Sequence, residues 1–270
     1  MRRADISVEL LVKIGGSTLG QHDTTLADLV ALQKQGRTPV VVHGGGKVIT
    51  EWQARLGLQA RFVRGLRVTD QATLEMVIAV LAGLVNTSLV AELNALGGKA
   101  VGLSGADSQL IEARVQDTEL GRVGEVTRVN PDLVEALLDR GYMPVIAPLG
   151  FQPQRTAGEP WTMLNINADT AAAEIAVGVR AKLLFFTTDV PGLMDASGAV
   201  LKGVTRAEAE KLIADGVATS GMIPKIRACL RAAEAGATAC IIDGRQPRTL
   251  LDCINGKFTG TMFKPVKQAP

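Results

Sequence analysis

The chain joins an apolar run to a glycine turn twice, as ELLVKIGG at residues 9–16 and as PVVVHGGGK at residues 39–47. Short apolar runs that end in glycine are typical of strands buried on both faces of a parallel sheet. Residues 26–35, between them, predict a helix that begins at a capping box of Thr25 and Asp28. A strand, a helix and a second strand in this order indicate an α/β fold.

The same rhythm continues along the rest of the chain. It predicts further strands at residues 100–103, 144–148, 182–187 and 238–242 and an edge strand at residues 261–263. Short alternating runs in residues 111–129 and 151–164 predict hairpins beside the main sheet. We therefore expect a three-layer α/β/α sandwich with a mostly parallel central sheet. Because no linker rich in Pro, Gly or Ser divides the chain, residues 1–180 and 181–270 are predicted to be an N-terminal and a C-terminal lobe of one body.

Composition narrows the functional classes. Apolar residues make up 47% of the 270 residues and aromatic residues 3%, so the core is expected to consist of Ala, Val, Leu and Ile. The formal charge of +2 comes without a block of Lys and Arg, which argues against a nucleic-acid partner. The longest apolar run, residues 76–85, is too short to cross a bilayer, and the N-terminal segment shows no export signal. We expect a cytoplasmic protein without a membrane partner.

Polar and glycine-rich segments are expected where strands end, at residues 13–17, 43–47, 187–192 and 219–225. Ligands of doubly wound sheets bind beyond the carboxyl ends of the strands, and glycine lets backbone N–H groups approach an anion. Two such turns, each with a lysine, favour a phosphate or carboxylate ligand. The GxxxxGK[ST] and GxGxxG patterns and the HRD and DFG motifs are absent. We expect His43 to orient its loop by hydrogen bonding.

Six ordered motifs resemble the amino acid kinase family over nearly the whole chain, residues 11–263. They are KIGG at 13–16, HGGG at 43–46, GLRVT at 65–69, NINADT at 165–170, TDVPG at 188–192 and GMIPK at 221–225. The resemblance implies the family's three-layer fold, with the amino-acid substrate in the N-terminal lobe and ATP with Mg²⁺ in the C-terminal lobe. From the branch that it matches, it implies transfer of the γ-phosphoryl group of ATP to the side-chain carboxylate of N-acetyl-L-glutamate, the second step of arginine biosynthesis.

The resemblance assigns the phosphoryl-transfer chemistry to three residues. It places Lys13 and Lys225 at the transferring group and Asp169 as the organiser of both lysines. A carboxylate acceptor is already the nucleophile at neutral pH, so the reaction needs alignment and charge neutralisation rather than a base. The resemblance implies that the nucleotide site is lined by these residues: Gly15, Gly16, Thr188, Asp189, Gly192 and Met222. We assign no protein ligand to Mg²⁺, which is expected to be held by the phosphates of ATP.

The resemblance places the acceptor on a second group of residues. The amides of Gly45 and Gly46 would bind the carboxylate that is phosphorylated, Arg67 would clamp the α-carboxylate, and Asn165 would lie near the acetamido end. Structural alternatives stay open at this point. The lysine in the first strand could reach solvent at the strand end, Lys225 and Arg67 could be ordinary surface residues, and the aspartate of NINAD could simply cap its helix.

Two further functions compete with the expected one. One is a kinase for aminoadipate or glutamate linked to a carrier protein, in lysine or ornithine biosynthesis, for which Arg61 and Arg64 beside Arg67 would offer a basic rim. The other is a catalytically silent effector-binding protein on the same fold. We also expect a homodimer formed through the apolar helix near residues 74–96, without strong inhibition by arginine.

Overall fold

A seven-stranded sheet forms the centre of the molecule in the computed structural model, which describes residues 8–15, 24–153, 162–218 and 221–265. Its strands are β1 (Leu10–Ile14), β2 (Val40–His43), β5 (Ala100–Ser104), β8 (Met143–Ala147), β11 (Leu183–Thr188), β12 (Thr238–Asp243) and β13 (Thr261–Phe263). Their order is β13-β12-β11-β1-β2-β8-β5, and every neighbouring pair is parallel except β12 with β13. The mostly parallel sheet and the edge strand at residues 261–263 are therefore confirmed, and the edge strand runs antiparallel to β12.

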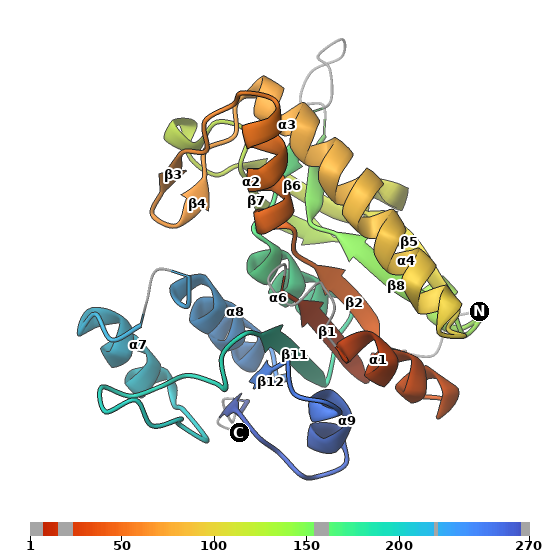
Figure 1. The fold of residues 1–270 in the computed structure, drawn as a ribbon, viewed down its shortest axis with the longest axis vertical. Coiled ribbons are helices and arrows are strands. Elements are labelled where there is room, and N and C mark those ends of the chain that lie inside the picture. Colours follow the sequence, from red (N-terminus) through yellow and green to blue (C-terminus); the bar gives the residue numbers. More distant parts are fainter. Residues whose placement is uncertain (1–7, 16–23, 154–161, 219–220, 266–270) are drawn as a thin grey trace.

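Helices cover both faces of this sheet, which gives three layers (Figure 1). On one face lie α5 (Asp132–Leu138), α6 (Ala168–Gly178) and α8 (Ile223–Glu234), and α7 (Arg206–Ala214) packs on α8. On the other face lie α1 (Thr25–Lys34), α2 (Gly46–Arg55), α3 (Gln71–Ile78), α4 (Asn86–Ala95) and α9 (Thr249–Ile254). Alternation along β1 sends Leu11 to the first face and Leu10 and Val12 to the second, as the pleat of a strand requires.

A smaller sheet lies beside the main one. It contains β6 (Ile111–Val115), β7 (Gly124–Val129), β9 (Leu149–Gln152) and β10 (Thr162–Asn165), in the order β10-β9-β6-β7. A separate hairpin pairs β3 (Phe62–Val63) with β4 (Leu66–Arg67), and two single-turn 3₁₀ helices cover Asp107–Gln109 and Thr118–Leu120. The two hairpins predicted beside the main sheet are confirmed by the antiparallel pairs β6–β7 and β9–β10. The division into lobes at residue 180 stays a prediction.

The longest helix is continuous from Gln71 to Ala95, because a π-helical segment, Ala79–Val85, joins α3 to α4. It is longer than the apolar run seen in the sequence. The helix has 25 residues, and an 18-residue window of it has a mean hydropathy of 1.9, which would suffice for a membrane span by length and composition alone. Its inner face packs on β5 and β8 and supplies Leu89 and Leu93 to the core, as a helix covering a sheet does.

The structure has a capping box at α7 but none at α1, so the capping box predicted from Thr25 and Asp28 is wrong. Thr205 and Glu208 form the reciprocal capping box of α7. At α1 the helix starts one residue earlier than predicted, so Thr24 is the N-cap residue and makes no side-chain cap bond. Asp28 instead turns into the core, where its Oδ2 accepts a hydrogen bond of 3.3 Å from the amide of Leu251 in α9. The carboxylate therefore satisfies the free N–H of a neighbouring helix rather than that of its own.

Candidate active site

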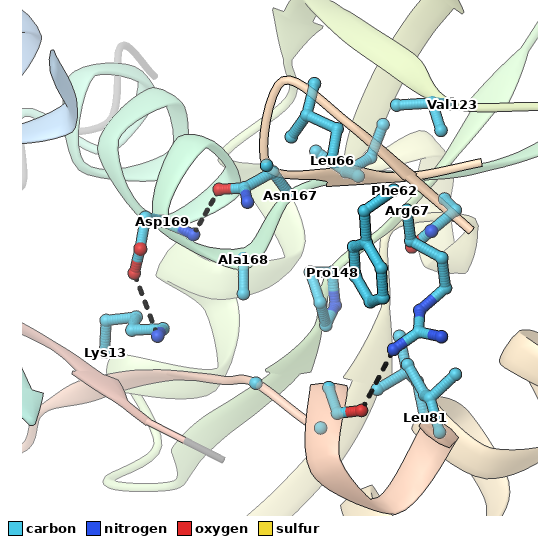
Figure 2. A pocket seen from close by; sticks show the side chains of 17 residues that line it. Lys13, Phe62, Leu66, Arg67, Leu81, Val123, Pro148, Asn167, Ala168 and Asp169 are labelled. Carbon is cyan, nitrogen blue, oxygen red and sulfur yellow. Dashed lines mark hydrogen bonds and ion pairs between the residues drawn. The ribbon is translucent and has the colours of Figure 1, made fainter. Parts of the chain in front are cut away.

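The carboxyl ends of β1 and β2 open into a cavity of about 230 Å³ (Figure 2). The parallel register sets Ile14 of β1 opposite His43 of β2, so the residues that follow both strands lie at the same edge of the sheet. The lining comprises Lys13, Gly44, Gly45, Gly46, Ile49, Phe62, Gly65, Leu66, Arg67, Leu81, Val123, Pro148, Asn165, Ile166, Asn167, Ala168 and Asp169. Six residues predicted from the sequence to bind or act on the substrate thus share one cavity.

Three ionised side chains meet at one end of the cavity, which we call the charged end: Lys13, Asp169 and Lys225. The Nζ of Lys13 lies 2.8 Å from Oδ1 of Asp169, and the Nζ of Lys225 lies 3.0 Å from Oδ2 of the same carboxylate. All three residues are at least nine-tenths buried. Two cations around one anion leave one excess positive charge. A buried excess charge is costly unless a ligand balances it, so this end is suited to an anionic ligand.

Local structure explains how these side chains converge. Lys13 shares the pleat face of Leu11, which looks toward α6 and α8. Asp169 lies in the first turn of α6, where the Oδ1 of Asn167 accepts hydrogen bonds from the amides of Asp169 and Thr170. Asn167 therefore caps α6, and the carboxylate of Asp169 remains available to pair with the two lysines. Lys225 lies in the first turn of α8, an unfavourable place for a cation that the Asp169 carboxylate compensates.

The carboxylate of the charged end stays ionised at neutral pH. Burial alone would raise the pKa of Asp169, but the two lysines outweigh that effect and hold the pKa of this carboxyl at about 2. Burial lowers the pKa of Lys13, and the repulsion from Lys225 acts in the same direction, while Asp169 opposes both. The alternatives in which Lys13 reaches solvent, Lys225 is a surface residue or Asp169 merely caps a helix are wrong for this structure.

The turn after β2 presents backbone amides to the cavity. Gly45 is the N-cap residue of α2 and Gly46 its first residue, and neither amide donates a hydrogen bond to the part of the chain that the structure describes. A Cβ at Gly45 would lie 2.5 Å from a methyl carbon of Leu81, so a side chain there would have to displace that methyl group. The free amides at a helix N-terminus are suited to an anion, as expected from the glycine pattern.

Arg67 is held at the opposite end of the cavity, which we call the arginine end: Arg67, Gln53, Thr50 and Phe62. Its guanidinium donates to Oε1 of Gln53, to Oγ1 of Thr50 at 2.8 Å and to the carbonyl of Gly46 at 3.1 Å. It also lies over the ring of Phe62, 4.7 Å from the ring centre. Figure 2 shows Arg67 and Phe62 on one side of the cavity and Lys13 with Asp169 on the other. The alternative of an ordinary surface arginine is wrong, since the residue is 8% exposed.

Comparison with known proteins agrees with this architecture. A family model described as "Amino acid kinase family" matches residues 9–243. The chain belongs to the amino acid kinase family. Within this family, an acetylglutamate kinase of Dehalococcoides mccartyi (strain BAV1) is 46% identical over 242 residues, which cover 90% of this chain and 89% of the relative. An acetylglutamate kinase of Syntrophomonas wolfei is 41% identical over 284 residues, with 97% of both chains covered.

Solved structures show the same amino acid kinase fold. The crystal structure of a protein from Streptococcus mutans UA159 has a TM-score of 0.82 at 29% identity and covers 97% of this chain and 100% of its own. Carbamate kinase from Giardia lamblia has a TM-score of 0.65 at 16% identity and covers 97% of this chain and 99% of its own. The second likeness extends to the fold alone.

The described residues that the family resemblance assigned to the nucleotide are not among those that line this cavity. Thr188 ends β11 and donates to Oδ1 of the exposed Asp189 at 3.2 Å, and Met222 is the N-cap residue of α8. Gly192 has φ 154° and packs closely against the hydroxyl of Thr261, so it serves the backbone of its turn. The amide of Gly15 donates to the carbonyl of Thr187 at 3.2 Å. Gly16 lies outside the described residues.

Asn165 lines the cavity, but its side chain is engaged, because Nδ2 donates to Oγ1 of Thr69 at 3.1 Å. Sequence reasoning missed three residues of the arginine end: Gln53, Thr50 and Phe62. A signal existed for two of them, since Gly46, Thr50 and Gln53 follow one another at helical i, i+4 and i+7 spacing on α2. It also missed Asn86, a buried polar residue in the middle of the long apolar helix.

Proposed function

We propose that the chain transfers the γ-phosphoryl group of ATP to the side-chain carboxylate of N-acetyl-L-glutamate, the second step of arginine biosynthesis. The observation that carries this proposal is one cavity with a buried, positively charged cluster at one end and a fixed guanidinium at the other. Such a cavity suits a substrate with two carboxylates, one to be phosphorylated and one to be held. The relatives named acetylglutamate kinase, at 41–46% identity over most of the chain, support the same acceptor.

The chemistry places simple demands on the protein. A carboxylate oxygen of the acceptor forms a bond to the γ-phosphorus while the bond from that phosphorus to the bridging oxygen breaks, so ADP leaves and an acyl phosphate remains. No proton has to move, because the acceptor is ionised at neutral pH. Lys13 and Lys225 neutralise the charge of the transferring group, and Asp169 holds both ammonium groups in place. The free amides of Gly45 and Gly46 bind the reacting carboxylate.

The remaining roles follow from position. Arg67 would hold the α-carboxylate of the acceptor, and Asn165 would lie near the acceptor's acetamido group. We assign the nucleotide to the carboxyl ends of β1 and β11 and to the start of α8, with these residues: Gly15, Gly16, Thr188, Asp189, Gly192 and Met222. Among the described residues no cluster of three or more His, Cys, Asp or Glu side chains could hold a metal ion. We expect Mg²⁺ to arrive on the phosphates of ATP, where it would offset their charge.

Carrier-bound aminoadipate or glutamate is the weaker alternative. The relatives quoted above are named for the free acetylated amino acid. The basic rim that a carrier would need is also partly occupied, since Arg64 pairs with Asp117 and Glu119. We therefore favour a kinase that acts on a small free acceptor.

A coupled assay of ADP release tests the proposal. We expect saturable turnover with N-acetyl-L-glutamate and little with free glutamate or aminoadipate, and at least a 100-fold loss in Lys225→Met, on the order of what one oxyanion-hole donor contributes. Turnover only with a carrier-bound acceptor would transfer the function to the alternative. Ligand binding without any turnover would make the protein an effector-binding member of the family.

We further propose a homodimer in the cytoplasm, built through the helix Gln71–Ala95, with no nucleic-acid or membrane partner. The outer side of this helix is exposed and apolar at Leu84, and small at Ala79, Gly83 and Ala91. Such a surface allows two helices to approach closely. Light scattering should give twice the chain mass, and Leu84→Glu should give the mass of one chain. An unchanged dimer in Leu84→Glu would place the interface elsewhere.

A further inference from the structure

A buried histidine lies directly behind the glycine turn, and the proposed chemistry does not use it. His43 is the last residue of β2 and is fully buried. Its Nδ1 lies 2.9 Å from the carbonyl oxygen of Gly44, and its Nε2 lies 3.1 Å from Nδ2 of Asn86. Asn86 is the first residue of α4, directly after the π-helical segment, and is itself 5% exposed.

The partners of Asn86 fix the protonation of the ring. Its Nδ2 also donates to the carbonyl of Val145 at 2.9 Å and approaches the carbonyl of Leu103 at 3.5 Å. Carbonyls accept only, so this atom is the amide nitrogen and the His43 Nε2 must accept from it. The proton of a neutral ring then resides on Nδ1, which donates to the Gly44 carbonyl. In a doubly protonated ring, the Nε2–H would face the N–H of the Asn86 amide, and two donors cannot bond to each other. The arrangement therefore favours the neutral tautomer with its proton on Nδ1.

This hydrogen bond determines where the next amide points. The carbonyl of Gly44 and the N–H of Gly45 belong to one trans peptide, in which the two groups point in opposite directions. Holding the carbonyl toward the imidazole therefore directs the N–H of Gly45 away from it, on the side of the cavity that Gly45 lines. The amide of Gly44 is fixed as well, because it donates to the carbonyl of Ile14 at 2.9 Å.

The surrounding structure is shaped to hold Asn86 in place. A Cβ on Gly102 of β5 would lie 2.1 Å from Oδ1 of Asn86, so the glycine makes room for the amide. The π-helical segment that ends at Val85 also carries Leu81, whose methyl carbon occupies the space beside Gly45. One helix thus contacts the glycine turn directly through Leu81 and indirectly through Asn86 and His43.

We propose that Asn86 and His43 are positioning residues, which act through the Gly44 carbonyl to aim the Gly45 amide at the acceptor carboxylate. The proposal rests on the function proposed above, since it assigns a purpose to that amide. Neither residue is among those that line the cavity. Both set the geometry of a group that does line it, and a misplacement of about 1 Å in such a group can lower the rate on the order of 100-fold.

Charge supports the same arrangement. Burial lowers the pKa of His43 to about 4, and nearby Lys13 of β1 acts in the same direction. Among the described residues, Lys13 is the charged group acting on the ring, while β8 contributes the Val145 carbonyl and α4 the Asn86 amide. A neutral imidazole adds no further positive charge beside Lys13, which leaves the balance of the charged end unchanged.

Nitrogen-15 NMR of the imidazole tests the tautomer without any assay of activity. The chain has two histidines, so His22→Ala leaves His43 as the single imidazole signal. We expect the Nδ1–H form, with no titration between pH 8 and about 5. An Nε2–H form, or titration near the ordinary histidine pKa of about 6.5, would overturn the proposal.

Kinetics separates positioning from general packing through two asparagines of the same helix. Asn94 also joins α4 to the sheet, since its Oδ1 accepts from the amide of Ala100 at 2.7 Å. It lies about two helical turns beyond Asn86, farther from the glycine turn. We expect Asn86→Leu to lower kcat about 10- to 100-fold and to shift the Gly45 amide resonance, while Asn94→Leu changes neither. Equal kcat in the two variants, with the Gly45 resonance unmoved, would refute the positioning role. An inactive wild-type protein would refute the proposed function instead, and the two NMR measurements would still decide on the positioning.

Discussion

At the charged end, side chains from β1, α6 and α8 form two ion pairs around one carboxylate and leave one excess positive charge inside the protein. At the arginine end, one cation is held by neutral oxygens of α2 and by an aromatic ring of the adjoining hairpin. The first arrangement joins parts of the chain that are more than 50 residues apart, whereas the second lies within residues 46–67. Changes at the charged end should therefore affect stability and rate together, and changes at the arginine end should affect mainly the binding of the acceptor.

The largest effect is expected when the anion of the charged end is removed. Asp169→Asn leaves two buried ammonium groups without a counter-charge, and the free energy of unfolding should fall by about 3–5 kcal/mol. Lys225→Met removes the excess cation instead and keeps the pair of Lys13 with Asp169, so its stability loss should be much smaller. Urea unfolding measures both, and an exposed lysine of another ion pair, in Lys211→Met, is the control. Equal losses in the two buried variants would contradict the charge balance described here.

The next largest effect is expected when the guanidinium of Arg67 is replaced. Arg67→Lys keeps the positive charge but cannot donate to Gln53, Thr50 and Gly46 in the same geometry. We expect kcat/KM for N-acetylglutamate to fall about 10- to 100-fold, which corresponds to about 1.4–2.7 kcal/mol. Most of this loss should appear in KM, while unfolding by urea changes little. A variant that loses kcat alone would place Arg67 at the transferring group and would remove the contrast between the two ends.

Acid should weaken the charged end in a defined pH range. The folded pKa of Asp169 is about 2, below its ordinary value of 3.8, so the protonated form is disfavoured in the fold. The resulting stabilisation is complete above the ordinary value and is lost as the pH falls from about 4 toward 2, in total roughly 2 kcal/mol. Subtracting the unfolding free energies of Asp169→Asn from those of the wild type at pH 5, 3.5 and 2.5 isolates this contribution. A difference that stays constant with pH would be inconsistent with an ionised Asp169.

A smaller effect is expected behind the guanidinium. Gln53→Met keeps the volume of the side chain but removes the oxygen that accepts from Arg67, which should raise KM for the acceptor about 3- to 10-fold. Gln33 provides the control, because it also bonds to the backbone of other elements, through Gly141 and Lys99, and lies outside the cavity lining. Gln33→Met should leave KM unchanged. If the two variants raised KM equally, Gln53 would have no specific part in placing the guanidinium.

The two ends of the cavity also differ in how much of them could be predicted from the sequence. The parallel sheet followed from apolar runs that end in glycine, and the convergence of Lys13 with Asp169 and Lys225 followed from ordered family motifs. Gln53 and Asn86 were missed, because a polar side chain in a helix is usually exposed, and its partners depend on which helix face meets the sheet. The capping box at Thr25 failed for a related reason. Asp28 matched a local pattern, but a helix distant in sequence offered its carboxylate a buried partner.

Asp28 provides the smallest and most direct test of what the two lysines do for Asp169. Both carboxylates are buried, but Asp28 accepts from a backbone amide and forms no salt bridge with a described residue. Burial raises the pKa of Asp28, whereas the lysines lower that of Asp169. The stability gained from protonated Asp28 is thus present below the ordinary carboxyl pKa and is lost as the pH rises through the raised folded value.

Asp28→Asn keeps an oxygen for the amide of Leu251 and removes the buried charge. At pH 7 we expect the free energy of unfolding to stay constant or to rise by up to about 1 kcal/mol, opposite in sign to Asp169→Asn. Urea unfolding at pH 7 measures the change, and Asp28→Ala, which removes the acceptor as well, should be destabilised. If Asp28→Asn lost as much stability as Asp169→Asn, a buried carboxylate would matter through its charge alone. The contrast between an acid paired with two cations and a buried acid without a salt bridge to a described residue would then have no energetic basis.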